Sequence, residues 1–134
     1  MTVANFGSFS FYYESYMLVS DCGSIEVILK NDPLYRHFLL LGTYSEKLKN
    51  VNGMKSWITE DDLTSIWYHP KDKTWVISLM GLIKIKSSET NVSNPFDVPY
   101  NEWFYKDLDQ WVKTKNDSDD IIVRCLRGNI IIGY

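Results

Sequence analysis

The stretch Ser65–Ser78, SIWYHPKDKTWVIS, decides the fold class of this chain. Two runs of β-branched and aromatic residues flank a short polar segment, a pattern that predicts a β-hairpin. Because Pro70 suits the first central position of a type I turn and Asp72 can hydrogen-bond its own backbone, we place the loop at Pro70–Lys73. Trp67 then stands among serines on the outer face. The opposite face is large and apolar, and we expect it in the core; it carries Ile66, Tyr68, Trp75 and Ile77.

Short alternating runs of the same kind recur along the chain, separated by Gly, Pro, Asn and Asp. They lie at Ser24–Leu29, Phe38–Tyr44, Lys55–Ile58, Leu82–Lys86, Glu102–Tyr105, Asp120–Leu126 and Asn129–Tyr134. This spacing predicts an all-β fold, an antiparallel β-sandwich or small barrel of about 8–9 short strands. We expect at most one or two short helical turns, and Trp103–Lys113 and the capped turn at Thr59 are the two candidates.

Length and composition indicate one domain over residues 1–134, with a core at 22–125 and strand-like extensions at both ends. The chain has 134 residues, of which 45% are hydrophobic, and a net charge of −3. Its 14 basic residues are scattered along the sequence, which argues against a nucleic-acid partner. No apolar run reaches the length of a membrane span, so we expect no membrane insertion. The first residues lack the pattern of a signal peptide.

The side chains that could carry catalysis or bind metal have simpler structural interpretations. Of the two histidines, His37 precedes a predicted strand and His69 lies at the tip of the hairpin. Thr59–Asp62 and Asn116–Asp120 are acidic, but the second lacks the Gly and distant Glu of a Ca²⁺ loop. Two Cys and two His without short paired spacing do not make a zinc site. We therefore expect no metal, no cofactor and no enzymatic activity.

Cys22 and Cys125 lie near opposite ends of the predicted core. If the strands that carry them pair side by side, one disulfide would close a loop of about 100 residues and imply an oxidising compartment. The alternative is two buried free thiols in a cytoplasmic protein. The sequence pattern leaves both open.

An ordered set of motifs resembles a Cys-bracketed small β-module that recurs, often in tandem, in cell-surface proteins of invertebrates and protists. The motifs are Cys22, LGTY (Leu41–Tyr44), VNG (Val51–Gly53), Trp57, IWY (Ile66–Tyr68), WVIS (Trp75–Ser78) and IIVRC (Ile121–Cys125). The resemblance implies a bonded Cys22–Cys125 pair, an extracellular or cell-surface location, and binding or scaffolding without catalysis. A cytoplasmic location stays the alternative, given the absence of a signal peptide in this chain.

From these observations we expect a non-catalytic module that binds a protein or glycan through exposed aromatics and sheet edges. The expected ligand-binding residues form a shallow aromatic patch of Trp57, Trp67, Tyr100 and Trp103. Alternatively, the loop Asn94–Trp103 folds over the tryptophans and seals them as a second core. Two other functions stay open: a structural subunit that docks or self-associates by its terminal strands, and a small hydrolase that uses scattered carboxylates.

Overall fold

Nine antiparallel strands form one curled sheet in the part of the chain that the structure describes. The structure is a computed structural model and describes residues 22–29, 38–114 and 121–126. The strands are β2 (Ser24–Leu29), β3 (Gly42–Glu46), β4 (Trp57–Ile58), β5 (Thr64–His69), β6 (Thr74–Leu79), β7 (Leu82–Ser87), β8 (Trp103–Asp107), β9 (Gln110–Lys113) and β10 (Ile121–Cys125). Short 3₁₀ turns occur at η2 (Phe38–Leu40), η3 (Pro95–Asp97) and η4 (Tyr100–Glu102). The expected all-β fold is confirmed.

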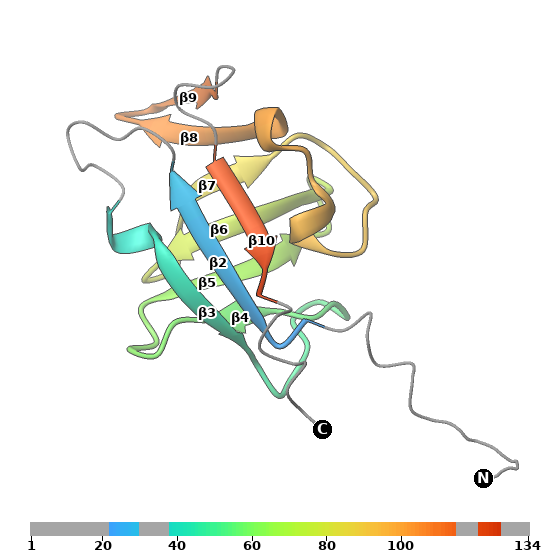
Figure 1. Ribbon diagram of the computed structural model, residues 1–134. Coiled ribbons are helices and arrows are strands. Elements are labelled where there is room, and N and C mark those ends of the chain that lie inside the picture. The colour runs from blue at the N-terminus through green and yellow to red at the C-terminus, as the bar shows by residue number, and fades with distance from the viewer. Residues whose placement is uncertain (1–21, 30–37, 115–120, 127–134) are drawn as a thin grey trace, which may run out of the picture.

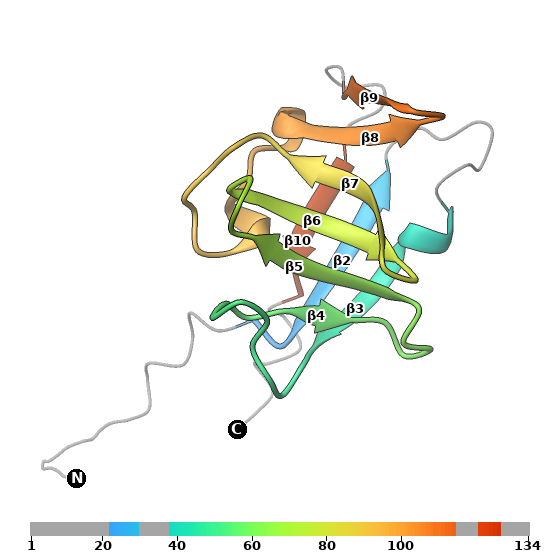
Figure 2. The same ribbon diagram turned by 180° about the vertical axis from the view of Figure 1, so that it is seen from behind.

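The strand order is β10-β2-β3-β4-β5-β6-β7-β8-β9, so β2 to β9 follow one another as a meander. The last strand, β10, returns to pair with β2. In Figure 1, β10, β2 and β3 form a front layer that crosses in front of β5, β6 and β7, and β8 and β9 lie at the top. Figure 2 shows the rear layer from the other side, with β5 to β7 nearest the viewer. The sheet curls into a half-barrel around the core.

The predicted hairpin is confirmed in every pair. His69 pairs with Thr74 across the Pro70–Lys73 loop, and the register continues through Tyr68↔Trp75 to Thr64↔Leu79. Lys73 adopts a φ of 58°, which lets the chain turn back into β6. Ile66, Trp75 and Ile77 are fully buried, and Tyr68 packs at the edge of the core.

The segment predicted as a helical candidate, Trp103–Lys113, is a hairpin instead. Asp107 pairs with Gln110, which leaves Leu108 and Asp109 as a two-residue turn. Leu108 has a φ of 59° and its side chain is almost fully exposed, so this apolar residue is not part of the core. The helical offsets of Leu108 and Trp111 were therefore misleading.

The core lies between the two layers and is rich in tryptophan. Its fully buried members come from both layers and include Ile25, Val27, Tyr44, Trp57, Ile66, Trp75, Ile77, Trp103, Ile121 and Val123. The segment between β7 and β8, which carries η3 and η4, lies beside β10 and closes the open side of the half-barrel (Figure 1). The predicted terminal strand at Asn129–Tyr134, His37 and the acidic run Asn116–Asp120 lie outside the described residues.

Candidate functional site

The outer face of the rear layer carries a row of side chains that crosses five strands. Residues paired directly across neighbouring strands project to the same face of a sheet. The pairings place Trp67, Val76, Lys86, Phe104 and Lys113 in one such row. Val76 is buried even though it faces outward, so the flanking long side chains cover the middle of this face. Figure 2 looks onto this side of the molecule.

A groove of about 310 Å³ lies over β4 to β6, and we call it the Trp67 groove. Three serines, Ser56, Ser65 and Ser78, line it together with the Trp67 ring, and the exposed side chains of Leu63 and Met80 stand at its rim. Its volume is at the lower end of the range typical of small-ligand sites, about 300–1,000 Å³.

The serines of the Trp67 groove are not equivalent. The Trp67 indole Nε1–H donates to Ser78 Oγ at 3.0 Å, and the Ser65 and Ser78 hydroxyl oxygens are 3.1 Å apart. Ser56 precedes β4 and is fully buried, yet its Oγ has no hydrogen-bond partner among the described residues. A buried hydroxyl without a partner costs about 1–3 kcal/mol, so a position that keeps one needs an explanation. Ser56 stands behind the groove wall, but its hydroxyl is fully buried and is not accessible from the groove.

A second groove of about 470 Å³ lies over β6 to β9, and we call it the lysine groove. Lys84, Lys86 and Lys106 line it with the Trp111 ring, and Asp72 and Asp109 also contribute. Lys86 Nζ lies 4.6 Å from the centre of the Trp111 ring, and Lys106 Nζ lies 5.4 Å from it. The two grooves meet at the β6–β7 turn, because Gly81 lines both.

Two of the four predicted binding residues are core residues. Trp57 and Trp103 are each 0% exposed, so the prediction that they belong to a surface patch is wrong. The reason is the segment before β8: Phe96 packs edge-on against Trp57 with ring centres 6.4 Å apart, and Trp75 Nε1–H donates to the Val92 carbonyl at 3.1 Å. For Trp57 and Trp103 the alternative of a sealed core is correct.

The other two predicted residues are accessible but lie apart. Trp67 is half-buried, and its ring stacks against that of His69 with centres 5.6 Å apart. Tyr100 is 49% exposed, but it stands in η4, beside β10, and lines neither groove. The four residues therefore do not form one patch. Trp67 alone lies in a groove.

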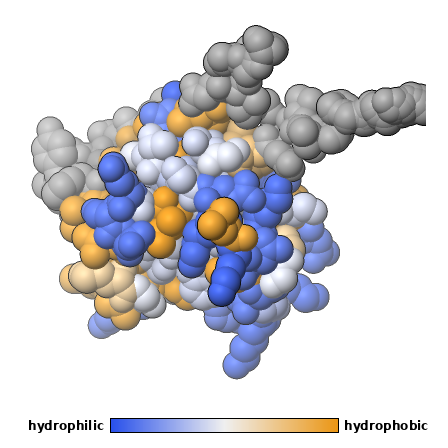
Figure 3. All heavy atoms as spheres, turned by 90° about the horizontal axis from the view of Figure 1, so that it is seen from below, coloured by the Kyte–Doolittle hydropathy of each residue, from blue (hydrophilic) through white to orange (hydrophobic). Residues whose placement is uncertain are grey.

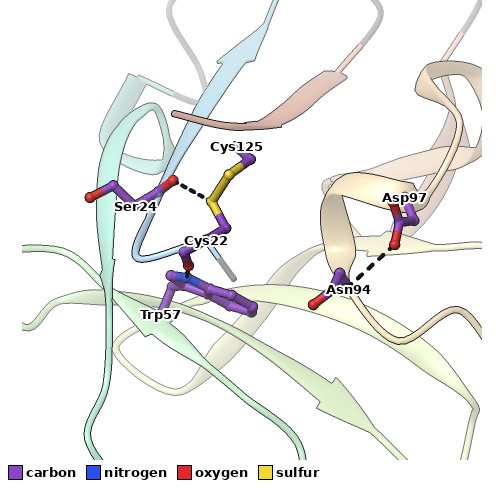
Figure 4. The surroundings of a disulfide bond; sticks show 6 residues. All are labelled: Cys22, Ser24, Trp57, Asn94, Asp97 and Cys125. Carbon is purple, nitrogen blue, oxygen red and sulfur yellow. Dashed lines mark hydrogen bonds between the residues drawn. A yellow bond between two sulfur atoms is a disulfide. The ribbon is translucent and has the colours of Figure 1, made fainter. Parts of the chain in front are cut away.

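Cys22 and Cys125 are bonded, as expected, with their Cα atoms 5.8 Å apart. Figure 4 shows the disulfide joining the segment before β2 to the end of β10. Beneath it, Trp57 Nε1–H donates to the Cys22 carbonyl at 2.9 Å, which explains how this buried indole is satisfied. A disulfide is consistent with an extracellular location.

The other described side chains that the sequence suggested for catalysis or metal binding form hydrogen bonds within the fold. His69 Nδ1 accepts the backbone N–H of Asp72 at 3.4 Å within the hairpin tip. The Thr59 hydroxyl and the Leu63 N–H both bond Asp61 Oδ1, at 2.7 and 3.0 Å, and these bonds lower the pKa of Asp61. In the described ranges, no group of three or more His, Cys, Asp or Glu is placed to hold a metal ion. Within the same ranges, no helix has the length and apolarity needed to cross a membrane.

The sequence interpretation missed Ser56, the three lysines and Trp111. The alternation in LIKIK could have shown that Lys84 and Lys86 share a face, but their approach to Lys106 and Trp111 depends on the pairing of β7, β8 and β9. Ser56 has no local signal, because its burial depends on the neighbouring strand. Figure 3, a view from below Figure 1, shows hydrophobic residues interspersed with hydrophilic ones, so a partner on that side would meet both.

Comparison with family models, with curated proteins and with solved structures found no match for this chain.

Proposed function

We propose that this protein is a non-catalytic binding module that holds a glycan in the Trp67 groove. The observation that carries the proposal is a groove in which the half-buried Trp67 indole lies beside the hydroxyl groups of Ser65 and Ser78. A sugar ring offers both hydroxyl groups and a face of C–H bonds. The hydroxyls can bond serines, and the C–H face can pack against the electron-rich face of a tryptophan.

The groove chemistry favours a glycan over an apolar protein side chain. An apolar side chain would cover the half-buried hydroxyl of Ser65 without offering it a hydrogen bond, and that desolvation would weaken binding. A glycan hydroxyl removes that cost. The Ser65–Ser78 pair offers further donors and acceptors along the same wall. The disulfide supports an extracellular setting, where glycans are abundant ligands.

The test is binding of the labelled protein to an array of neutral and acidic glycans, followed by titration calorimetry with the oligosaccharides that bind. Trp67→Ala and Ser65→Ala should each weaken binding about tenfold, the loss expected for one good contact. Tyr100→Ala is the matched control, because Tyr100 is an exposed aromatic outside both grooves, and it should leave binding unchanged. Equal loss in Tyr100→Ala and Trp67→Ala would contradict the proposal, as would an array without any bound glycan.

The two alternative functions stay predictions. Docking by the terminal strands concerns segments outside the described residues, and no arrangement of carboxylates described above favours a hydrolase.

A further inference from the structure

The lysine groove gathers positive charge on a protein whose net charge is negative. The chain has 17 acidic and 14 basic residues, yet Lys84, Lys86 and Lys106 line one groove. Lys106 is distant in sequence from the other two, and it comes close to them because Lys86 pairs with Phe104, two residues before Lys106. Three of the 14 basic residues that are scattered along the chain are thus brought together on one face of the fold.

The ammonium groups of this groove have no carboxylate partner among the described residues. The described ion pairs with lysine are Lys55 with Glu46 and Lys113 with Glu102, both at 3.8 Å, and neither lies in the groove. Asp72 and Asp109 line the groove as well, so the lysines outnumber the acids by one. Three ammonium groups that have no ion-pair partner among the described residues repel one another in a concave site, and a bound anion would relieve that repulsion.

The Trp111 ring holds two of these ammonium groups without using up their donors. An ammonium group beside an indole face gains about 0.5–1 kcal/mol at an exposed site. The contact restricts the long side chains of Lys86 and Lys106, whereas the N–H groups directed away from the ring can still bond an acceptor. The side chains are therefore partly pre-organised for an anionic ligand.

We infer that the lysine groove is an anion site that takes the sulfate or carboxylate groups of an acidic glycan. The inference rests on the proposed function for the kind of ligand, since the two grooves meet at Gly81 on one face and a chain of sugar rings can extend from one into the other. An acidic glycan matches both grooves: hydroxyls and ring faces suit the Trp67 groove, and the anionic groups suit the lysines.

The test measures binding of a heparin-derived octasaccharide and of an oligogalacturonate by titration calorimetry, with a neutral dextran oligomer as reference. The variant Lys86→Gln with Lys106→Gln should weaken the affinity for the acidic oligosaccharides roughly tenfold or more, because it removes charge-assisted contacts. The matched control is Lys49→Gln with Lys71→Gln, which changes the net charge equally at exposed positions outside both grooves. The control should keep the affinity of the parent protein.

The outcomes separate the two proposals. Equal weakening in both double variants would overturn the anion site, because general charge attraction would then explain binding. Polyglutamate that competes as well as the octasaccharide at matched charge would also overturn it, in favour of an acidic peptide. Dependence on the lysines with no effect of Trp67→Ala or Ser65→Ala would support the anion site and contradict the glycan groove. Binding of neutral array glycans with no added affinity for acidic ones would support the glycan groove and contradict the anion site.

Discussion

At the residue scale, two buried hydroxyl groups differ in whether they form a hydrogen bond. The Tyr44 hydroxyl donates to the Leu40 carbonyl at 2.6 Å, whereas Ser56 Oγ has no described partner. Both residues are 0% exposed. Burial with a hydrogen bond is close to neutral or favourable, but burial without one is costly. Tyr44 thus supports the fold, and Ser56 weakens it.

Ser56→Ala should therefore stabilise the protein. We expect the free energy of unfolding in urea to rise by about 1 kcal/mol, since the unpaired hydroxyl is removed. Ser78→Ala is the control in the same groove: it breaks the bond from Trp67 and should lower stability by about 1 kcal/mol. A stability loss in Ser56→Ala comparable to that in Ser78→Ala would show that the Ser56 hydroxyl is satisfied.

The Tyr44 phenol predicts a loss of stability at alkaline pH. Desolvation by burial raises the pKa of Tyr44 from 10.0 to about 12; a bond with Thr64 opposes the rise and the charge of Asp61 adds to it. Because the folded state keeps the proton that the unfolded state loses, the contribution is complete below pH 10 and declines as the pH rises toward 12. At pH 11 the stability advantage over Tyr44→Phe should be smaller than at pH 8 by about 1 kcal/mol, measured by urea unfolding. A pH-independent difference would contradict the shift.

Elements differ in how far the sequence predicts them. The β5–β6 hairpin was predicted in register because its turn chemistry and alternation agree locally. The β8–β9 hairpin was not, since its Leu108–Asp109 turn lacks the Gly or Asn that is typical of two-residue hairpin loops. The burial of Trp57 under Phe96 also escaped prediction, because it depends on a contact between segments distant in sequence. Local signals predict strands, but the grooves arise from pairing across several of them.

The two faces of the β5–β6 hairpin should respond differently to truncation. Trp75→Ala removes a fully buried ring that contacts Trp57 and Tyr68, with ring centres at 6.2 and 5.3 Å, and should cost roughly 3–5 kcal/mol. Trp67→Ala removes a half-buried ring on the outer face and should cost about 1 kcal/mol. Denaturant melts of both variants measure the contrast. Equal costs would mean that Trp67 is part of a sealed core and would remove the basis of the groove.

At the scale of the whole molecule, the two ends of the described chain are held together by the pairing of β10 with β2 and by the disulfide. Arg124 Nη2 donates to Glu26 Oε1 at 2.7 Å across the strand pair. The disulfide joins the end of β10 to the segment just before β2. The sequence suggested the Cys22–Cys125 bridge from position and resemblance, but it could not show that η3 and η4 would cover the open side beside β10. The proposed binding face, which carries the two grooves, lies on the opposite layer from this closure (Figures 1 and 2).

This separation predicts that the disulfide controls stability and not binding. The bridge spans 103 residues of sequence, and its loss through Cys22→Ala with Cys125→Ala should lower the free energy of unfolding by about 2–5 kcal/mol. Reductant should destabilise the parent protein similarly and leave the double variant unchanged, which is the control for other effects of the reagent. At a temperature where the variant stays folded, its affinity for the array glycans should equal that of the parent, because the Trp67 groove is built on β4 to β6. A folded variant with weakened binding would show that closure of the front layer shapes the groove, and a stability loss under 1 kcal/mol would show that β10 is held by its strand pairing alone.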